Sequence, residues 1–128
     1  LRLLERKVAA GLDFLQTQMV FDLGAFDRFS AEMASVVPPT VEVFASVGIL
    51  RSARNLNFVR RSVPDCPVPE SLAERIAQGE GVAVAAQLAG EMAQRPGMRL
   101  HVIPLGGERH AHEVVSAFDR AGRSAASA

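Results

Sequence analysis

Residues 12–22 read LDFLQTQMVFD, and the interpretation of the whole chain depends on this stretch. It follows Gly11 and runs into an aspartate that can start a helix, so its apolar residues predict a strand over 14–21. Near-continuous apolar strands are typical of parallel sheets covered on both faces, and we therefore expect this strand to be buried. Gln16, Thr17 and Gln18 are costly inside such a strand unless each polar group finds a hydrogen-bond partner.

Gln18 lies towards the carboxyl end of this strand, and two roles are open to it. Ligands of α/β sheets and barrels bind at the carboxyl ends of the strands, which favours contact between the amide and a ligand. The alternative is a structural amide that hydrogen-bonds a neighbouring loop, and the strand alone favours neither role.

The composition excludes several classes of protein. The 128 residues carry 14 basic and 14 acidic side chains, so there is no positive field for nucleic acid. No apolar run is long enough to span a bilayer, and no signal peptide is recognisable. Cys66 is the only cysteine, which excludes an internal disulfide and favours a reducing cytoplasm. The chain opens on Leu1 in a helical pattern, so we expect a piece of a longer protein.

Strand patterns and helix patterns alternate along the chain. The expected strands are 14–21, 41–47 and 100–104. The expected helices are 1–10, a segment from Asp22 to the prolines at 38 and 39, 52–61, 69–79, 81–94 and 108–121. The residues expected to face inward from four of these helices are Leu23, Phe26, Phe29, Met33, Leu56, Val59, Leu72, Ala73, Ile76, Val114, Val115 and Phe118. The prolines of 63–69 predict an extended connection, and the small polar residues 122–128 predict a flexible tail after a domain over 1–121.

This alternation predicts an α/β fold with parallel strands joined by right-handed crossovers. A closed (β/α)8 barrel needs roughly 250 residues, so a chain of this length supplies about half of one. We expect the C-terminal part of such a barrel, with its last three strands. A free-standing three-stranded domain is the alternative, and it would leave two strand edges open.

Two motifs resemble one known family. They are the stretch Glu5–Gly11, with its basic pair before a glycine, and the stretch Thr17–Asp22, with its Thr-Gln pair followed by apolar residues and aspartate. The likeness continues in order through 41–47, 52–58, 63–69 and 99–105. Together these segments resemble the C-terminal portion of the methylenetetrahydrofolate reductase family, whose fold is a (β/α)8 barrel.

The resemblance implies a flavin-dependent oxidoreductase of one-carbon metabolism, with FAD as cofactor, NAD(P)H as electron donor and a folate as substrate. Gln18 matches a glutamine that hydrogen-bonds the pterin ring, and an amide offers the paired donor and acceptor that such a ring needs. Phe58 matches an aromatic residue that stacks on substrate, although plain helix core explains it equally well. Leu105 matches an apolar residue that lines the same pocket. Arg6 and Lys7 match a pair that holds flavin phosphates, and the alternative for them is a solvated helix face.

The chain departs from the family pattern at three places. Leu3 stands where the family usually has an asparagine, Ala45-Ser46 where the second strand usually ends in Pro-Gly, and Gly107 where an arginine often follows the last strand. These losses leave open a non-catalytic or flavin-independent folate-binding module. The family's acidic residue for proton transfer belongs to the first half of the barrel, so no catalytic residue is assigned in this chain.

The other reactive residues favour structural roles. His110 and His112 are two apart on an expected helix and point in different directions, so we expect no metal site there. His101 is interpreted as a packed or hydrogen-bonded core histidine. Gly106-Gly107 before a helix resembles a phosphate grip, which leaves a phosphate-binding barrel enzyme as a third hypothesis.

The barrel hypothesis also predicts partners and faces. We expect the row Phe14, Gln16, Gln18 and Val20 to face the barrel interior. The expected partners are a folate and either the rest of the barrel or a second copy, with neither nucleic acid nor a membrane among them.

Overall fold

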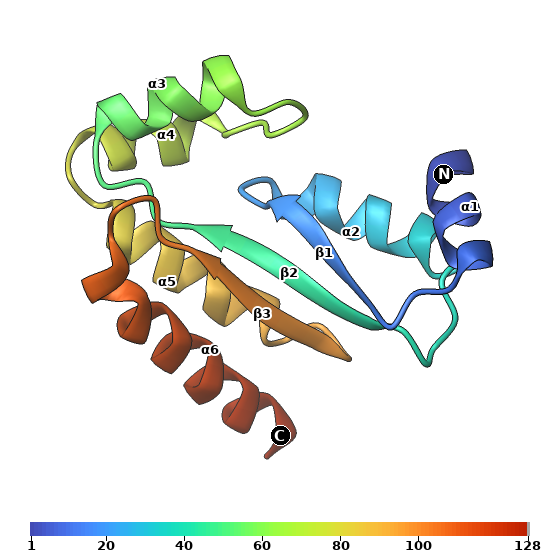
Figure 1. The fold of residues 1–128 in the computed structure, drawn as a ribbon. Coiled ribbons are helices and arrows are strands. Elements are labelled where there is room, and N and C mark those ends of the chain that lie inside the picture. Colours follow the sequence, from blue (N-terminus) through green and yellow to red (C-terminus); the bar gives the residue numbers. More distant parts are fainter. Residues whose placement is uncertain (128) are drawn as a thin grey trace.

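The structure, a computed structural model, describes residues 1–127, in which three strands alternate with helices (Figure 1). In chain order the elements are α1 (Arg2–Ala10), β1 (Phe14–Met19), α2 (Leu23–Met33), β2 (Glu42–Gly48), α3 (Ala53–Ser62), α4 (Glu70–Ala77), α5 (Gly81–Met92), β3 (Met98–Ile103), the short 3₁₀ helix η1 (Glu108–His110) and α6 (Ala111–Ala126). Side chains define two of the helix starts, because Asp22 accepts from the Ala25 N–H and Ser52 accepts from the Asn55 N–H.

The strands form one parallel sheet in the order β1-β2-β3, which confirms the expected α/β class. In its register Phe44 of β2 lies between Gln16 of β1 and Arg99 of β3, and Ser46 lies beside His101. Both β1 and β3 are edge strands, so each has one edge without a neighbouring strand.

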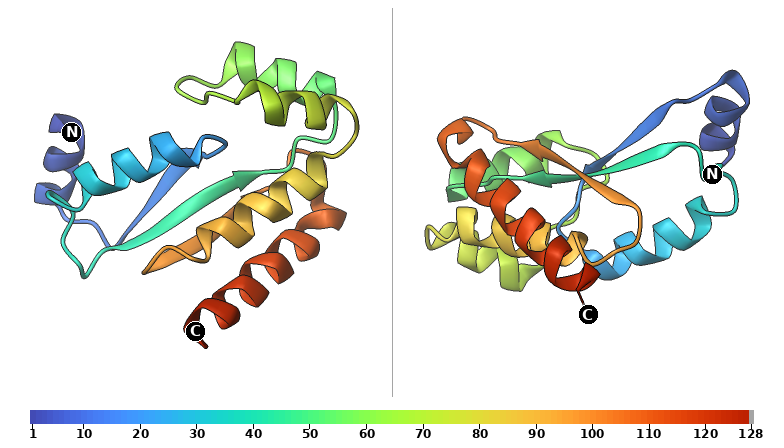
Figure 2. Two further views of the ribbon diagram at one scale, coloured as in Figure 1. Left: turned by 180° about the vertical axis from the view of Figure 1, so that it is seen from behind. Right: turned by 90° about the horizontal axis from the view of Figure 1, so that it is seen from below.

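Helices cover one face of this sheet (Figure 2). Phe26 of α2 and Met92 of α5 pack together against Ala45 of β2 and Val20, and Val114 of α6 packs in the main core. Ala45 and Val47 therefore face the helices and are fully buried. The side chains between them face the opposite side, where no helix covers Phe14 and Gln16, which are both exposed.

A β-bulge in β1 overturns two of the expectations for this strand. The register shifts between Gln16 and Met19, so two residues lie where one would pair with β2. The alternation of side chains therefore changes, and Val20 packs against Phe26 on the helix side and not in one row with Phe14 and Gln16. The expected burial is also wrong, since Met19 is the only buried residue of this edge strand.

Several boundaries differ from those the sequence predicts. β1 ends at Met19, and β2 continues to Gly48, so Ala45-Ser46 lies inside the strand. Pro69 precedes α4 as its cap residue, and Val115 is exposed and not inward-facing. α6 runs to Ala126, so the first part of the expected tail is helical, and its last residue, 128, lies outside the described residues.

Helix α5 approaches the chain closely where β2 ends. A Cβ atom on Gly81 would collide with the backbone carbonyl of Leu50, so this position has no room for a side chain. The contact places α5 against Ile49 and Leu50, which are fully buried. In Figure 1, α3 and α4 lie beyond the carboxyl ends of the strands, and Leu56 and Val59 of α3 belong to the same core.

Candidate functional site

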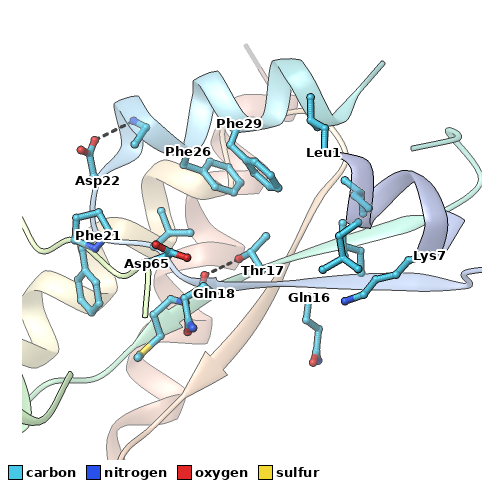
Figure 3. A pocket seen from close by; sticks show the side chains of 17 residues that line it. Leu1, Lys7, Gln16, Thr17, Gln18, Phe21, Asp22, Phe26, Phe29 and Asp65 are labelled. Carbon is cyan, nitrogen blue, oxygen red and sulfur yellow. Dashed lines mark hydrogen bonds between the residues drawn. The ribbon is translucent and has the colours of Figure 1, made fainter. Parts of the chain in front are cut away.

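A cavity of about 770 Å³ lies along the free edge of β1, between this strand and the helices α1 and α2 (Figure 3). It is lined by Leu1, Leu3, Leu4, Lys7, Leu15, Gln16, Thr17, Gln18, Met19, Val20, Phe21, Asp22, Ala25, Phe26, Phe29, Asp65 and Pro67. The lining is largely apolar, and its polar groups come from β1, from Lys7 and from two aspartates. A concave apolar site with a few polar groups is the usual form of a small-molecule site.

Gln18 lies in this lining, and only the oxygen of its side-chain amide forms a hydrogen bond within the described residues. Its Oε1 accepts a hydrogen bond from the Met19 N–H at 3.0 Å, while its Nε2 donates to no group in residues 1–127. Figure 3 shows Gln16 and Gln18 on the same side of β1, away from Phe26 and Phe29. The bond to the strand's own backbone therefore leaves an N–H donor available to a ligand.

Thr17 holds the bulge together through two hydrogen bonds to Ser46 of β2. The Ser46 N–H donates to Thr17 Oγ1 at 3.0 Å, and Ser46 Oγ donates to the Thr17 carbonyl at 2.7 Å. The threonine hydroxyl thus takes the place of a backbone acceptor that the bulge moves out of register. Bulges often occur at functional sites, and Gln18 is one of the two residues in this bulge.

His101 of β3 extends this polar network to all three strands. Its Nδ1 lies 2.9 Å from Ser46 Oγ, so the expected hydrogen bond is present, but the ring is half-buried and does not belong to the core as expected. Ser46 is the one fully buried polar residue among those described. From the sequence, Ser46 was interpreted only as a departure from a family pattern. The feature that could have indicated its hydrogen-bonding role is its position as a polar residue within a buried strand.

The structure brings together two of the five site residues that the resemblance implies. Gln18 and Lys7 line the cavity, whereas Arg6 on the same helix is exposed outside the lining. Phe58 is exposed on α3, with 47% of its surface accessible, and Leu105 follows β3 and packs on the main core. Phe58 and Leu105 therefore lie at the carboxyl-end side of the sheet and not in this cavity.

The family model described as methylenetetrahydrofolate reductase matches residues 1–119. The chain belongs to this family. Comparison with curated proteins and with solved structures gave no match. Membership of the methylenetetrahydrofolate reductase family points to a folate-related oxidoreductase, and the match covers every strand and all but the last turns of α6.

One departure from the methylenetetrahydrofolate reductase pattern has a structural counterpart. Gly107 stands where the family often has an arginine, and a Cβ atom there would lie 3.2 Å from Cδ and 3.3 Å from Nε of Arg51. Arg51, from the loop after β2, thus lies against the turn at Gly106 and Gly107 and brings a guanidinium to it. No carboxylate in residues 1–127 forms a salt bridge with Arg51.

The remaining reactive side chains have local partners. His110 Nδ1 lies 3.0 Å from Glu113, and this hydrogen bond lowers the pKa of the Glu113 carboxyl, whereas His112 Nδ1 contacts the Arg109 carbonyl. Cys66 is buried, its Sγ donates to the Met19 carbonyl, and burial raises the pKa of its thiol, which disfavours a nucleophilic thiolate. Within residues 1–127 no group of three His, Cys, Asp or Glu side chains could hold a metal ion.

No helix in this range is long and apolar enough to cross a bilayer.

Proposed function

We propose that this chain forms one part of a (β/α)8 barrel in which further strands continue the sheet beyond β1 and β3. The two free strand edges and the face without helices support this arrangement. A closed barrel pairs every strand edge and fills the inner face with side chains from all its strands. On this proposal Gln16, Phe44 and His101 point into the barrel.

On this proposal the assembled protein is a folate-dependent oxidoreductase of one-carbon metabolism, with FAD as cofactor, a nicotinamide electron donor and a folate carrying a one-carbon group as substrate. The observation that carries this proposal is the family match over residues 1–119. The Gln18 amide supports it, because its Nε2 is free to donate while its Oε1 is fixed by the Met19 N–H. A pterin ring presents acceptors that such a donor can reach.

Phe58 and Leu105 complete the substrate site in this proposal. Both lie on the side of the carboxyl ends of the strands, where substrates bind in α/β barrels. The exposed ring of Phe58 offers an apolar face for stacking, and Leu105 offers an apolar wall. The substrate site therefore spans the ends of all three strands and is wider than the cavity beside β1.

The basic pair on α1 fits the phosphates of a flavin. Neither Arg6 nor Lys7 forms a salt bridge with a carboxylate in residues 1–127, and Lys7 lines the cavity. Charged donors of this kind hold phosphate oxygens through charge-assisted hydrogen bonds. When bound, FAD supplies the hydride-transfer chemistry, and the part of the protein described here positions and neutralises its phosphates.

A flavin-independent folate-binding module is the second candidate. Leu3 favours it, because this residue lines the cavity where the family usually has a polar flavin contact. In that case the protein binds a folate, the rest of the barrel or a second copy, and neither nucleic acid nor a membrane.

The absorbance spectrum of the purified complete protein decides between these candidates. A flavin spectrum that bleaches with NADH or NADPH and returns with methylenetetrahydrofolate supports the oxidoreductase. Replacing Arg6 and Lys7 together with alanine should then release flavin more readily, and the retention that remains should depend less on salt. The control is Arg2→Ala, which removes a cation of the same helix that does not belong to the basic pair. Folate binding by a protein without flavin supports the module, and absence of folate binding contradicts both candidates.

A further inference from the structure

We propose that His101 is a second ligand-binding residue, which presents its Nε2 lone pair as a hydrogen-bond acceptor on the uncovered face of the sheet. The class of ligand, a heteroaromatic ring with N–H donors such as a pterin, rests on the proposed function. The protonation of the His101 imidazole does not, because it follows from the hydrogen bonds alone.

The number of protons in the network fixes which nitrogen of His101 carries hydrogen. Ser46 Oγ lies 2.7 Å from the Thr17 carbonyl, and a carbonyl can only accept, so the single hydroxyl proton points to Thr17. His101 Nδ1 lies 2.9 Å from the same Oγ and must therefore be the donor. In its neutral form His101 consequently carries hydrogen on Nδ1 and a lone pair on Nε2.

The network has no other arrangement available to it. Thr17 Oγ1 already accepts from the Ser46 N–H and donates to the Gln18 carbonyl, so it cannot take the Ser46 proton. Ser46 is fully buried, which excludes water as an alternative partner for its hydroxyl. The hydrogen bonds therefore run from His101 as donor to Ser46, and from Ser46 as donor to the Thr17 carbonyl of β1.

The outer nitrogen of this ring has no partner in residues 1–127, and the ring is half-buried on the uncovered face. Arg99 is the nearest charged residue along the same side of β3, and it is paired with Glu42. Gln18 projects from β1 on the side away from the helices (Figure 3). Since β2 separates β1 from β3, Gln18 and His101 are roughly 10 Å apart, a span that a fused ring system with its substituents can bridge. The donor of Gln18 and the acceptor of His101 thus form a complementary pair.

A crossed pair of variants separates the two ends of the imidazole. His101→Asn keeps a donor for Ser46 and removes the outer acceptor, whereas His101→Gln keeps an outer polar group and loses the donor to Ser46. We expect the Asn variant to melt near the parent temperature and to bind 5-methyltetrahydrofolate about ten-fold more weakly, as loss of one hydrogen bond predicts. The Gln variant should melt lower and retain more of the binding.

Nitrogen NMR of the complete protein reads the ring state without reference to activity. We expect hydrogen on Nδ1 in the free protein, a shift of the unprotonated Nε2 on addition of 5-methyltetrahydrofolate, and loss of the fixed tautomer in Ser46→Ala. Hydrogen on Nε2 in the parent overturns the proposal. Unchanged binding in His101→Asn, beside weaker binding in Gln18→Leu, also overturns it while leaving the proposed function intact. If the parent does not bind the folate at all, the proposed function and this ligand assignment fail together.

Discussion

At the scale of single residues, two amide side chains on β1 allow the proposed substrate contact to be tested. Gln18 and Gln16 are both exposed amides on the same side of the strand, so they differ mainly in position (Figure 3). The resemblance to the family assigns a ligand only to Gln18. The pair therefore offers a test in which chemistry and exposure are matched.

We predict that Gln18→Leu in the complete protein raises the folate KM and lowers turnover while the melting temperature changes little. One missing hydrogen bond in such a site costs about 1–3 kcal/mol. The matched comparison, Gln16→Leu, should change the kinetics less, because Gln16 lies two residues further from the carboxyl end of the strand. A large loss of thermal stability in Gln18→Leu with normal kinetics would mean that the amide serves the bulge through its bond to the Met19 N–H.

At the scale of elements, sequence periodicity predicted the order of helices and strands and most of the core. Leu56 and Val59 of α3, and Ala73 and Ile76 of α4, are each three residues apart and are buried as expected. The bulge could not be predicted in this way, because it depends on Thr17 Oγ1 accepting from Ser46, which is 29 positions further along the chain. Local patterns carry no information on such a cross-strand bond.

The residues of the candidate site also differ in whether a local sequence pattern could predict them. Gln18 was predicted as a site residue from a motif within one strand, whereas the link between Ser46 and His101 spans 55 positions and follows only from the register of β2 and β3. The prediction that Val20 faces the barrel interior was wrong for the same reason, since one inserted residue reverses the side of every residue after it.

Two glycines of α5 make opposite predictions for alanine. Gly81→Ala should destabilise the protein by about 1–3 kcal/mol, because the new methyl group collides with the Leu50 carbonyl. Gly90→Ala is the control in the same helix, since its Cβ would lie 3.8 Å from its nearest neighbours, in ordinary contact. Removing a helical glycine there should stabilise by up to about 1 kcal/mol. Denaturant unfolding of both variants measures the difference, and equal effects would contradict the close approach of α5.

A bidentate ion pair joins α2 to the turn that follows α5 and predicts that stability depends on pH in the acid range. Arg95 donates to both carboxylate oxygens of Asp27, at 2.6 and 2.8 Å. The hydrogen bond from Arg95 lowers the pKa of Asp27 below its ordinary 3.8. A lowered folded-state pKa stabilises the protein fully above that ordinary value, and the contribution is lost as pH falls through the folded-state value.

Asp27→Asn should therefore melt below the parent at neutral pH, and the difference should shrink below about pH 4. High salt should reduce it as well, because the pair is exposed. The control is Asp119→Asn, which removes a carboxylate that forms no ion pair in residues 1–127. A deficit that persists unchanged at low pH would show that Asp27 acts through packing and not through its charge.

At the scale of the whole molecule, the sheet combines a covered face with an uncovered one. Phe14 leaves 55% of its surface accessible on the uncovered face and packs edge-to-face on Phe44, with ring centroids 5.9 Å apart. Beside these rings lies the free edge of β1, with unpaired backbone donors and acceptors. An exposed apolar face next to an open strand edge favours pairing with another chain.

We predict that the 128 residues on their own dimerise or aggregate and do not catalyse hydride transfer. Phe14→Lys should shift sedimentation towards the monomer, because a lysine beside an open edge disfavours strand addition. The matched control is Phe58→Lys, which replaces a phenylalanine of similar exposure on α3, away from the sheet, and should leave association unchanged. A stable monomer with a cooperative melt before any substitution would instead identify a self-sufficient α/β domain. The uncovered face would then need no further strands, and the barrel assignment would be wrong.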